Sequence, residues 1–191
     1  MVPRMNNATR ARLHYFYSQA LTRVHLDERA IEQLRRAVAI DPACVRAWRS
    51  LGFMLASRGR TADAIAAFQT ALKLDGNDPV TRFNLGFIYH GQKLFIEAIA
   101  EFDQVVKAAP KNDRAWYGLG VCHQDDGDFA ASVAPLQEAS KLQYFNPHAG
   151  YHLALAWHKL GEHEKCEAEF DRVKSFDPKM AAKMAQDFGT G

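Results

Sequence analysis

The sequence predicts an all-α protein built as a solenoid of five helix–turn–helix repeats. Three observations support this fold class. Residue types recur at an interval of 34 residues, apolar residues within each interval follow a helical spacing, and strand signals are absent. Trp48, Leu51, Gly52 and Leu55 show the helical spacing, at i, i+3, i+4 and i+7.

The repeat is seen in ladders of similar residues, each 34 positions apart. Two of the ladders consist of small residues, and the other two consist of large, mostly apolar residues. The small ladders are Ser18, Gly52, Gly86, Gly120, Ala154 and Ala30, Ala64, Ala98, Ser132, Cys166; the large ones are Tyr17, Leu51, Leu85, Leu119, Leu153 and Leu34, Phe68, Phe102, Leu136, Phe170. Small residues let two helices approach closely while large ones fill the remaining space. The ladders therefore predict paired, closely packed helices.

The predicted elements follow in order along the chain. Residues 1–10 are expected to form a flexible segment. Five repeats follow, each a pair of antiparallel helices, and a short helix at 178–188 is expected to cap the last one. The repeats span 11–44, 45–78, 79–112, 113–146 and 147–180.

Glycine and proline mark the two kinds of turn in this plan. Gly59, Gly127 and Gly161 fall between the paired helices, where a residue free to adopt positive φ is useful. Pro42 and Pro110 fall between successive repeats, where a proline ring ends one helix or opens the next.

These residues resemble the tetratricopeptide repeat family, whose pattern is W-x2-L-G-x2-Y, then A-x3-F, then P. The pattern occurs as Trp48, Leu51, Gly52, Leu55, Ala64, Phe68 and again as Leu85, Gly86, Tyr89, Ala98, Phe102, Pro110. The resemblance implies a right-handed superhelical solenoid whose first helices line a concave surface. It also implies a non-enzymatic protein-binding role.

The candidate groove residues lie on the first helices and face away from the Leu/Gly ladders. They are Arg46, Arg49, Phe53, Phe83, Asn84, Phe87, His90, Arg114, Tyr117, Gln124, His148, Tyr151 and His152. The set is aromatic and basic with almost no acid, a composition typical of interaction sites. We therefore expect an adaptor, scaffold or co-chaperone that binds an extended, acidic peptide segment.

Chaperone-binding members of the family hold a C-terminal carboxylate with basic residues and asparagines from three consecutive repeats. Arg49, Asn84 and Arg114 resemble three positions of that clamp, while Phe53 and Gly118 stand where an asparagine and an arginine are expected. The alternative function is a structural subunit or self-associating scaffold, such as a homodimer, that uses its convex face or its first repeat.

Composition limits the other classes. The 191-residue chain has a net charge of +2, too small to indicate nucleic acid or an anionic membrane as partner, and no apolar run approaches the ~20 residues of a membrane span. With no apolar signal-peptide core, we expect a cytoplasmic protein. The three cysteines are widely spaced and odd in number, which favours free thiols.

Catalytic and metal-binding motifs are also missing. His148 and His152 are four residues apart, a spacing that can chelate zinc, but no glutamate follows His148 as in H-E-x-x-H. The "DDGD" run at 125–128 lacks the spacing of a calcium loop. We expect no enzyme activity, no metal site and no cofactor.

Overall fold

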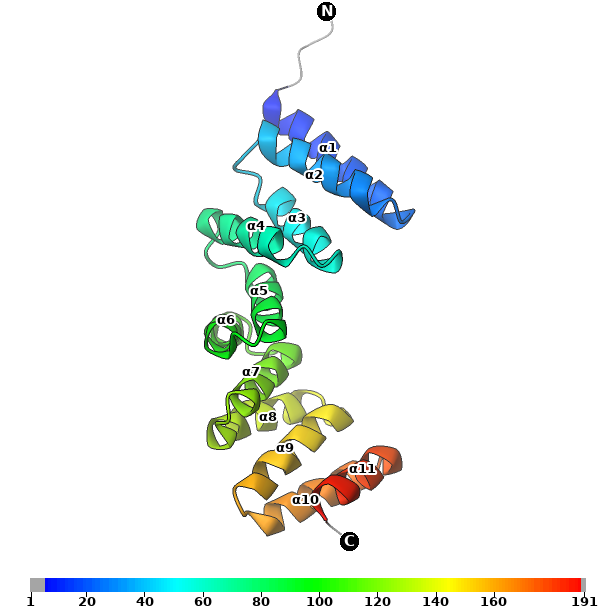
Figure 1. The fold of residues 1–191 in the computed structure, drawn as a ribbon, viewed down its shortest axis with the longest axis vertical. Coiled ribbons are helices and arrows are strands. Elements are labelled where there is room, and N and C mark those ends of the chain that lie inside the picture. The colour runs from blue at the N-terminus through cyan, green and yellow to red at the C-terminus, as the bar shows by residue number, and fades with distance from the viewer. Residues whose placement is uncertain (1–5, 190–191) are drawn as a thin grey trace, which may run out of the picture. The chain divides into compact units, whose positions relative to one another are not determined.

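The computed structural model describes residues 6–189, and within them it contains eleven α-helices and no strand (Figure 1). The helices are α1 (Asn7–Arg23), α2 (Asp27–Ile40), α3 (Val45–Ser57), α4 (Thr61–Leu74), α5 (Pro79–Gly91), α6 (Phe95–Ala108), α7 (Asp113–Asp125), α8 (Phe129–Leu142), α9 (Pro147–Lys159), α10 (His163–Lys174) and α11 (Pro178–Phe188). The all-α prediction is confirmed, because the described residues form helices and no strand.

The chain divides into two compact units, Met1–Ile88 and Tyr89–Gly191, with the boundary inside α5. In the first unit α2 packs on both α1 and α3, and α3 packs on α4. In the second unit α6 to α10 each pack on the next helix along the chain, and α11 packs on both α9 and α10. Each unit is therefore built from contacts between neighbouring helices, as expected for a repeat protein.

The N-terminal segment begins its helix earlier than the sequence suggested. The Asn6 side chain accepts a hydrogen bond from the backbone N–H of Thr9 at 2.8 Å, which caps α1. Residues 7–10 are therefore helical, and the expectation of a flexible segment through residue 10 is wrong for them. The rest of that expectation, residues 1–5, lies outside the described residues.

The small ladders allow the paired helices to approach, as predicted. A Cβ built on Gly52 would lie 2.7 Å from the Phe68 ring, and one built on Gly120 would lie 2.5 Å from Leu136 Cγ. Both distances are far shorter than an ordinary carbon–carbon contact of about 3.5–4.0 Å. Glycine is therefore required at these positions by the partner helix.

The turns within repeats all place one residue in the left-handed region. These residues are His25 (φ 58°), Gly59 (φ 72°), Lys93 (φ 60°), Gly127 (φ 90°) and Gly161 (φ 75°), at the same position of each repeat. The sequence identified only the three glycines. The turn geometry imposes the same conformation on a histidine and a lysine, at a cost of about 1–2 kcal/mol each.

One backbone carbonyl at the turn between repeats receives a side-chain donor each time. Trp48 Nε1 donates to the Pro42 carbonyl at 2.9 Å, and Trp116 Nε1 donates to the Pro110 carbonyl at 2.8 Å. Arg82 Nη2 donates to the Gly76 carbonyl at 2.9 Å.

The fourth turn obtains its donor from another helix. The position corresponding to Trp116 is Gly150, and Arg172 of α10 donates to the Tyr144 carbonyl in its place. A Cβ on Gly150 would lie 2.8 Å from Arg172 Nη2, so glycine leaves room for the arginine. An otherwise unsatisfied carbonyl is thus paired at every one of these turns.

Candidate functional site

A hollow of about 320 Å³ opens between the first helices of the first unit. Its walls come from α1, α3 and the first-unit part of α5, so we call it the α1–α3–α5 hollow. The lining residues are Gln19, Thr22, Arg49, Ser50, Phe53, Met54, Val80 and Asn84. Three predicted groove residues, Arg49, Phe53 and Asn84, are therefore brought together in one place.

Two exposed apolar side chains lie at this hollow, and the amides of Gln19 and Asn84 also line it. The Phe53 side chain is 56% exposed and Val80 is 53% exposed, while Met54 is buried behind them. The Asn84 side chain is half-buried, and no described residue makes a hydrogen bond to its amide. An asparagine amide both donates and accepts, so it can pair with a peptide group of a ligand.

Arg49 is already paired within the protein. Its Nη1 donates to both carboxylate oxygens of Asp78, at 3.1 and 3.3 Å. Asp78 is only 7% exposed and also accepts from the Thr81 hydroxyl at 2.6 Å and from the Val80 N–H at 3.1 Å. Its carboxylate therefore neutralises Arg49 at the wall of the hollow.

The environment of Asp78 shifts its pKa downward. Burial alone would raise the pKa, but the hydrogen bond from Thr81 and the charge and hydrogen bond of Arg49 outweigh burial. Asp78 was not among the predicted site residues, although its position directly before Pro79 and three residues before Thr81 is typical of a helix start.

The remaining predicted residues of the first unit do not line the hollow. Arg46 is exposed one turn before Ser50 on α3. Phe87 is highly exposed on α5, whereas Phe83 is half-buried. Arg46 therefore offers an exposed positive charge on the helix face that also carries Phe53.

In the second unit, two predicted groove residues bind each other across two helices. Gln124 of α7 donates from Nε2 to the backbone carbonyl of His152 at 2.7 Å. Gln124 Oε1 lies 2.7 Å from His152 Nδ1, a pairing that requires Nδ1 to carry the proton. Gln124 is buried, so this reciprocal pair joins α7 to α9.

The surroundings of His152 favour its neutral form. The pKa of His152 is lowered to about 4, chiefly by burial. The Asp125 carboxylate opposes this change, while His148 and Lys183 add to it. The Tyr117 ring meets the imidazole edge-on, with ring centroids 5.5 Å apart. His152 is therefore a neutral packing residue at pH 7.

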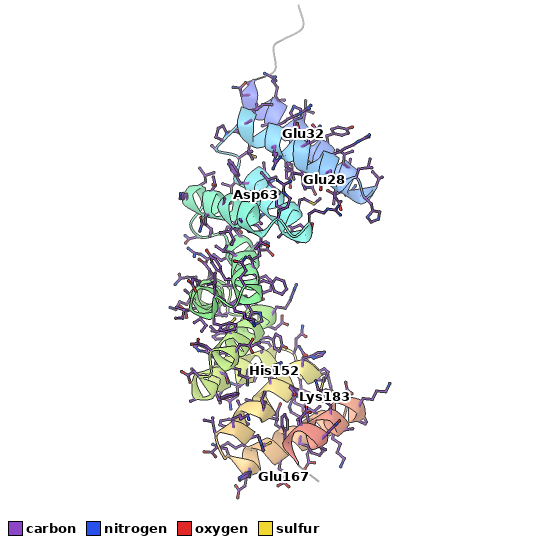
Figure 2. The ribbon with its side chains drawn as sticks, viewed as in Figure 1. Glu28, Glu32, Asp63, His152, Glu167 and Lys183 are labelled. Carbon is purple, nitrogen blue, oxygen red and sulfur yellow. The ribbon has the colours of Figure 1, made fainter. Side chains whose placement is uncertain are left out.

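Helix α11 contacts another predicted groove residue, Tyr151. The Tyr151 hydroxyl donates to Asp187 at 2.8 Å, and Lys183 Nζ lies 4.6 Å from the centre of the Tyr151 ring. Phe188 also packs against the ring, with centroids 5.4 Å apart. Figure 2 labels His152 on α9 and Lys183 on α11. Tyr151 is thus engaged by the last helix.

The other predicted residues of the second unit make no hydrogen bond to Gln124, Tyr151 or His152 that the structure records. His90 Nε2 lies 2.6 Å from Asp125, so this histidine pairs with a carboxylate at the end of α7. Arg114 and His148 are exposed. Among residues 6–189, no three His, Cys, Asp or Glu side chains are grouped closely enough to hold a metal ion.

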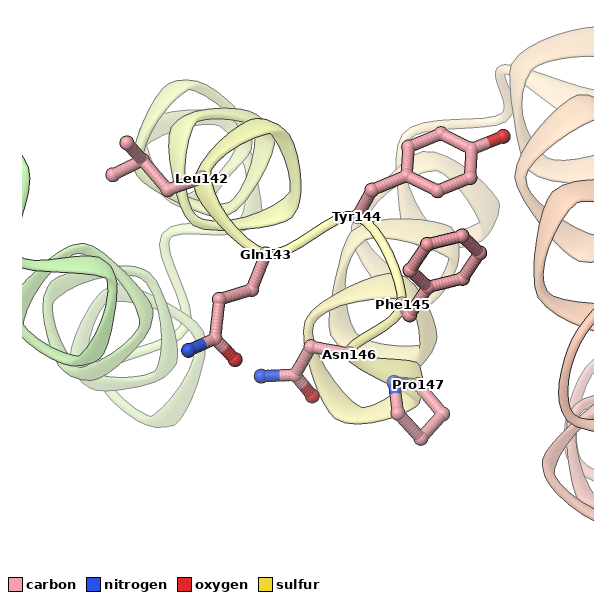
Figure 3. Close-up of a pocket in the computed structure, with 6 residues that line it drawn as sticks. All are labelled: Leu142, Gln143, Tyr144, Phe145, Asn146 and Pro147. Atoms are coloured by element: carbon pink, nitrogen blue, oxygen red, sulfur yellow. The ribbon is translucent and has the colours of Figure 1, made fainter.

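A second hollow lies at the turn between α8 and α9 and has a volume of about 620 Å³. Figure 3 shows the Tyr144 and Phe145 rings on one side of this turn and the Gln143 and Asn146 amides on the other. The two rings meet edge-on at 5.2 Å, and Asn146 caps α9 by accepting from the N–H of His148. These aromatic residues were not predicted as a site.

The comparisons with known proteins establish the family. A family profile described as Tetratricopeptide repeat matches residues 28–79 and 123–181, and a second profile of that description matches residues 55–119. The chain belongs to the tetratricopeptide repeat family, whose members are typically non-enzymatic protein-interaction scaffolds. None of the curated proteins matches the chain in sequence. None of the helices in the described part is long and apolar enough to span a membrane.

Solved structures of tetratricopeptide repeat proteins share the fold. A MamA double mutant is 24% identical, with a TM-score of 0.84 over 88% of this chain and 95% of its own. MamA from residue 41 to its end, from Desulfovibrio magneticus RS-1, is 24% identical, with a TM-score of 0.82 over 88% and 96%. YrrB, described as a TPR protein with an unusual peptide-binding site, is 17% identical, with a TM-score of 0.81 over 91% and 90%.

Proposed function

We propose that this chain is a non-enzymatic interaction module that binds an extended peptide segment at the α1–α3–α5 hollow. The observation that carries the proposal is the hollow itself, which combines exposed apolar side chains at its mouth with an unpaired amide. A single exposed Phe needs no explanation, but a concave apolar site with a convergent polar group is the usual form of a binding site. The peptide-binding site named for YrrB supports the same use of this fold.

The chemistry of the hollow describes the bound segment. An apolar side chain of the ligand enters between Phe53 and Val80, and Asn84 pairs with the ligand backbone. Arg49 does not select for acid, because Asp78 already neutralises it. An acidic ligand residue is bound instead by the exposed Arg46.

A carboxylate clamp of the co-chaperone type is not part of this proposal. A ligand carboxylate at Arg49 would have to displace Asp78, which is buried and held by three donors. The cost of leaving a buried carboxylate unpaired argues against that exchange.

A cytoplasmic location is proposed from the cysteines, because Cys44, Cys122 and Cys166 are all free thiols.

A phage-displayed library of random peptides tests the proposal. We expect the wild-type chain to select an apolar residue next to an acidic one. Phe53→Glu is expected to abolish selection, Asn84→Ala to weaken it, and the matched control Ile96→Glu, on the exposed face of α6, to leave it unchanged. Circular dichroism checks that all three variants remain helical. Equal selection by Phe53→Glu and wild type would overturn the proposal.

A further inference from the structure

Helix α1 carries a second, uncovered apolar surface. Leu13, Phe16, Tyr17 and Ala20 follow i, i+3, i+4 and i+7, so they form one stripe along the helix, which we call the α1 stripe. The three large side chains are 52%, 64% and 55% exposed, in that order. A contiguous exposed apolar stripe of this kind is uncommon on a soluble protein and marks an interaction site.

The other four repeats show what normally lies on these positions. Each of Leu13, Tyr17 and Ala20 has an equivalent residue in each of the four later repeats. All of these equivalent residues are buried except Ile88, which is half-buried. The buried ones are Ala47, Leu51, Met54, Thr81, Leu85, Ala115, Leu119, Cys122, Ala149, Leu153 and Ala156. Each of those repeats has a preceding repeat whose second helix can pack on its first, as α2 packs on α3. The element that covers these positions in the other repeats is therefore a helix with an apolar face.

The charges on α1 indicate the polar residues of that helix. The charged side chains of α1 are Arg10, Arg12 and Arg23, and the helix contains no Asp or Glu. At about 100° per residue, Arg10 lies on one side of the stripe and Arg12 and Arg23 lie on the other. Both borders of the stripe are thus positive and complement an acidic helix.

The same charges argue against a second copy of this chain. Two facing α1 helices would bring six arginines and no Asp or Glu to one interface. End-to-end stacking is also not supported. Among the described residues of α10 and α11, no large apolar side chain is highly exposed, so the last helices do not present a matching surface.

We infer that the α1 stripe is a docking surface for an amphipathic helix of another protein, whose apolar stripe is bordered by Asp and Glu. This surface is separate from the α1–α3–α5 hollow, since the stripe residues do not line the hollow. The partner helix packs on α1 in the way that α2 packs on α3.

A peptide copied from α6 provides a defined probe. α6 is a second helix that packs on the first helix of the next repeat, and it carries Glu97, Glu101 and Asp103 against one lysine. The capped peptide Phe95–Ala108, labelled with a fluorophore, is titrated with the full chain and read by anisotropy. A second peptide has the three acids replaced by Gln.

We expect the acidic peptide to bind and the Gln peptide to bind at least about tenfold more weakly, with the difference shrinking at high salt. Phe16→Ser/Tyr17→Ser is expected to lose at least about tenfold in affinity, whereas Ile96→Ser, an equally exposed apolar change, keeps it. The melting temperature of the double variant should match wild type, because both side chains are exposed.

Each other outcome overturns the inference. Absence of binding, or equal binding of both peptides or of the double variant, excludes an acidic helix at this surface. Light scattering that shows a dimer which the double variant disperses assigns the stripe to a second copy. Sedimentation with phosphatidylserine vesicles that depends on Phe16 and Tyr17 assigns it to a membrane surface.

Discussion

Asp78 is predicted to be the most costly polar residue to remove from the first unit. Asp78→Ala removes the hydrogen-bond acceptor for the Val80 N–H at the start of α5, worth about 1 kcal/mol. It also leaves the buried Thr81 hydroxyl and the Arg49 guanidinium without their acceptor. The hydrogen bond to charged Arg49 would contribute about 1.5–3 kcal/mol if fully buried, and less here because Arg49 is 33% exposed. We expect a total loss of about 3 kcal/mol.

Urea unfolding followed by circular dichroism measures this loss. Asp78→Asn is the matched variant, because it retains an acceptor oxygen but not the charge, and we expect it to lose about half as much. The pKa of Asp78 is depressed in the fold, so its contribution is present above the ordinary value of 3.8 and is lost as pH falls through the lower folded value. An alanine variant within about 0.5 kcal/mol of wild type would refute this account of Arg49 and Asp78.

Two further predictions concern packing and pH. Gly120→Ala should lower the free energy of unfolding by about 1–3 kcal/mol in urea, because the new Cβ meets Leu136. Gly91→Ala should be neutral or slightly stabilising, because its Cβ meets no other atom. Equal effects of the two variants would exclude close packing as the cause. The pKa of His152 is about 4 in the fold and 6.5 in the unfolded chain, so between these values only the unfolded chain binds the proton. The free energy of unfolding should therefore fall by about 2 kcal/mol as pH drops from 7.5 to 5. His152→Gln should lose this pH dependence, and an unchanged urea-midpoint profile would contradict the assigned environment.

The fold was predictable because its determinants recur. Gly52 and Gly120 face Phe68 and Leu136 one helix away, and the same small-against-large pairing is repeated along the chain. Periodicity thus reveals contacts between neighbouring helices. His25 was missed because its positive φ is imposed by the turn and not by its residue type.

The candidate site was only partly predictable, because a helix face does not reveal what its side chains bind. Arg49, Phe53 and Asn84 share the predicted face and do line one hollow. The same criterion selected Gln124, which the structure buries against His152. Polar residues that join neighbouring helices and polar residues that await a ligand have the same spacing, so sequence alone does not separate them.

The most direct test of the proposed binding site is a photo-crosslink from inside the hollow. Benzoylphenylalanine replaces Phe53, and in a matched sample it replaces Ile96 on α6. The two chains are irradiated in lysate of the source cell and their adducts are compared by mass spectrometry. We expect a partner peptide to be cross-linked from position 53 and not from position 96. No adduct at position 53, or the same adducts from both positions, would contradict it.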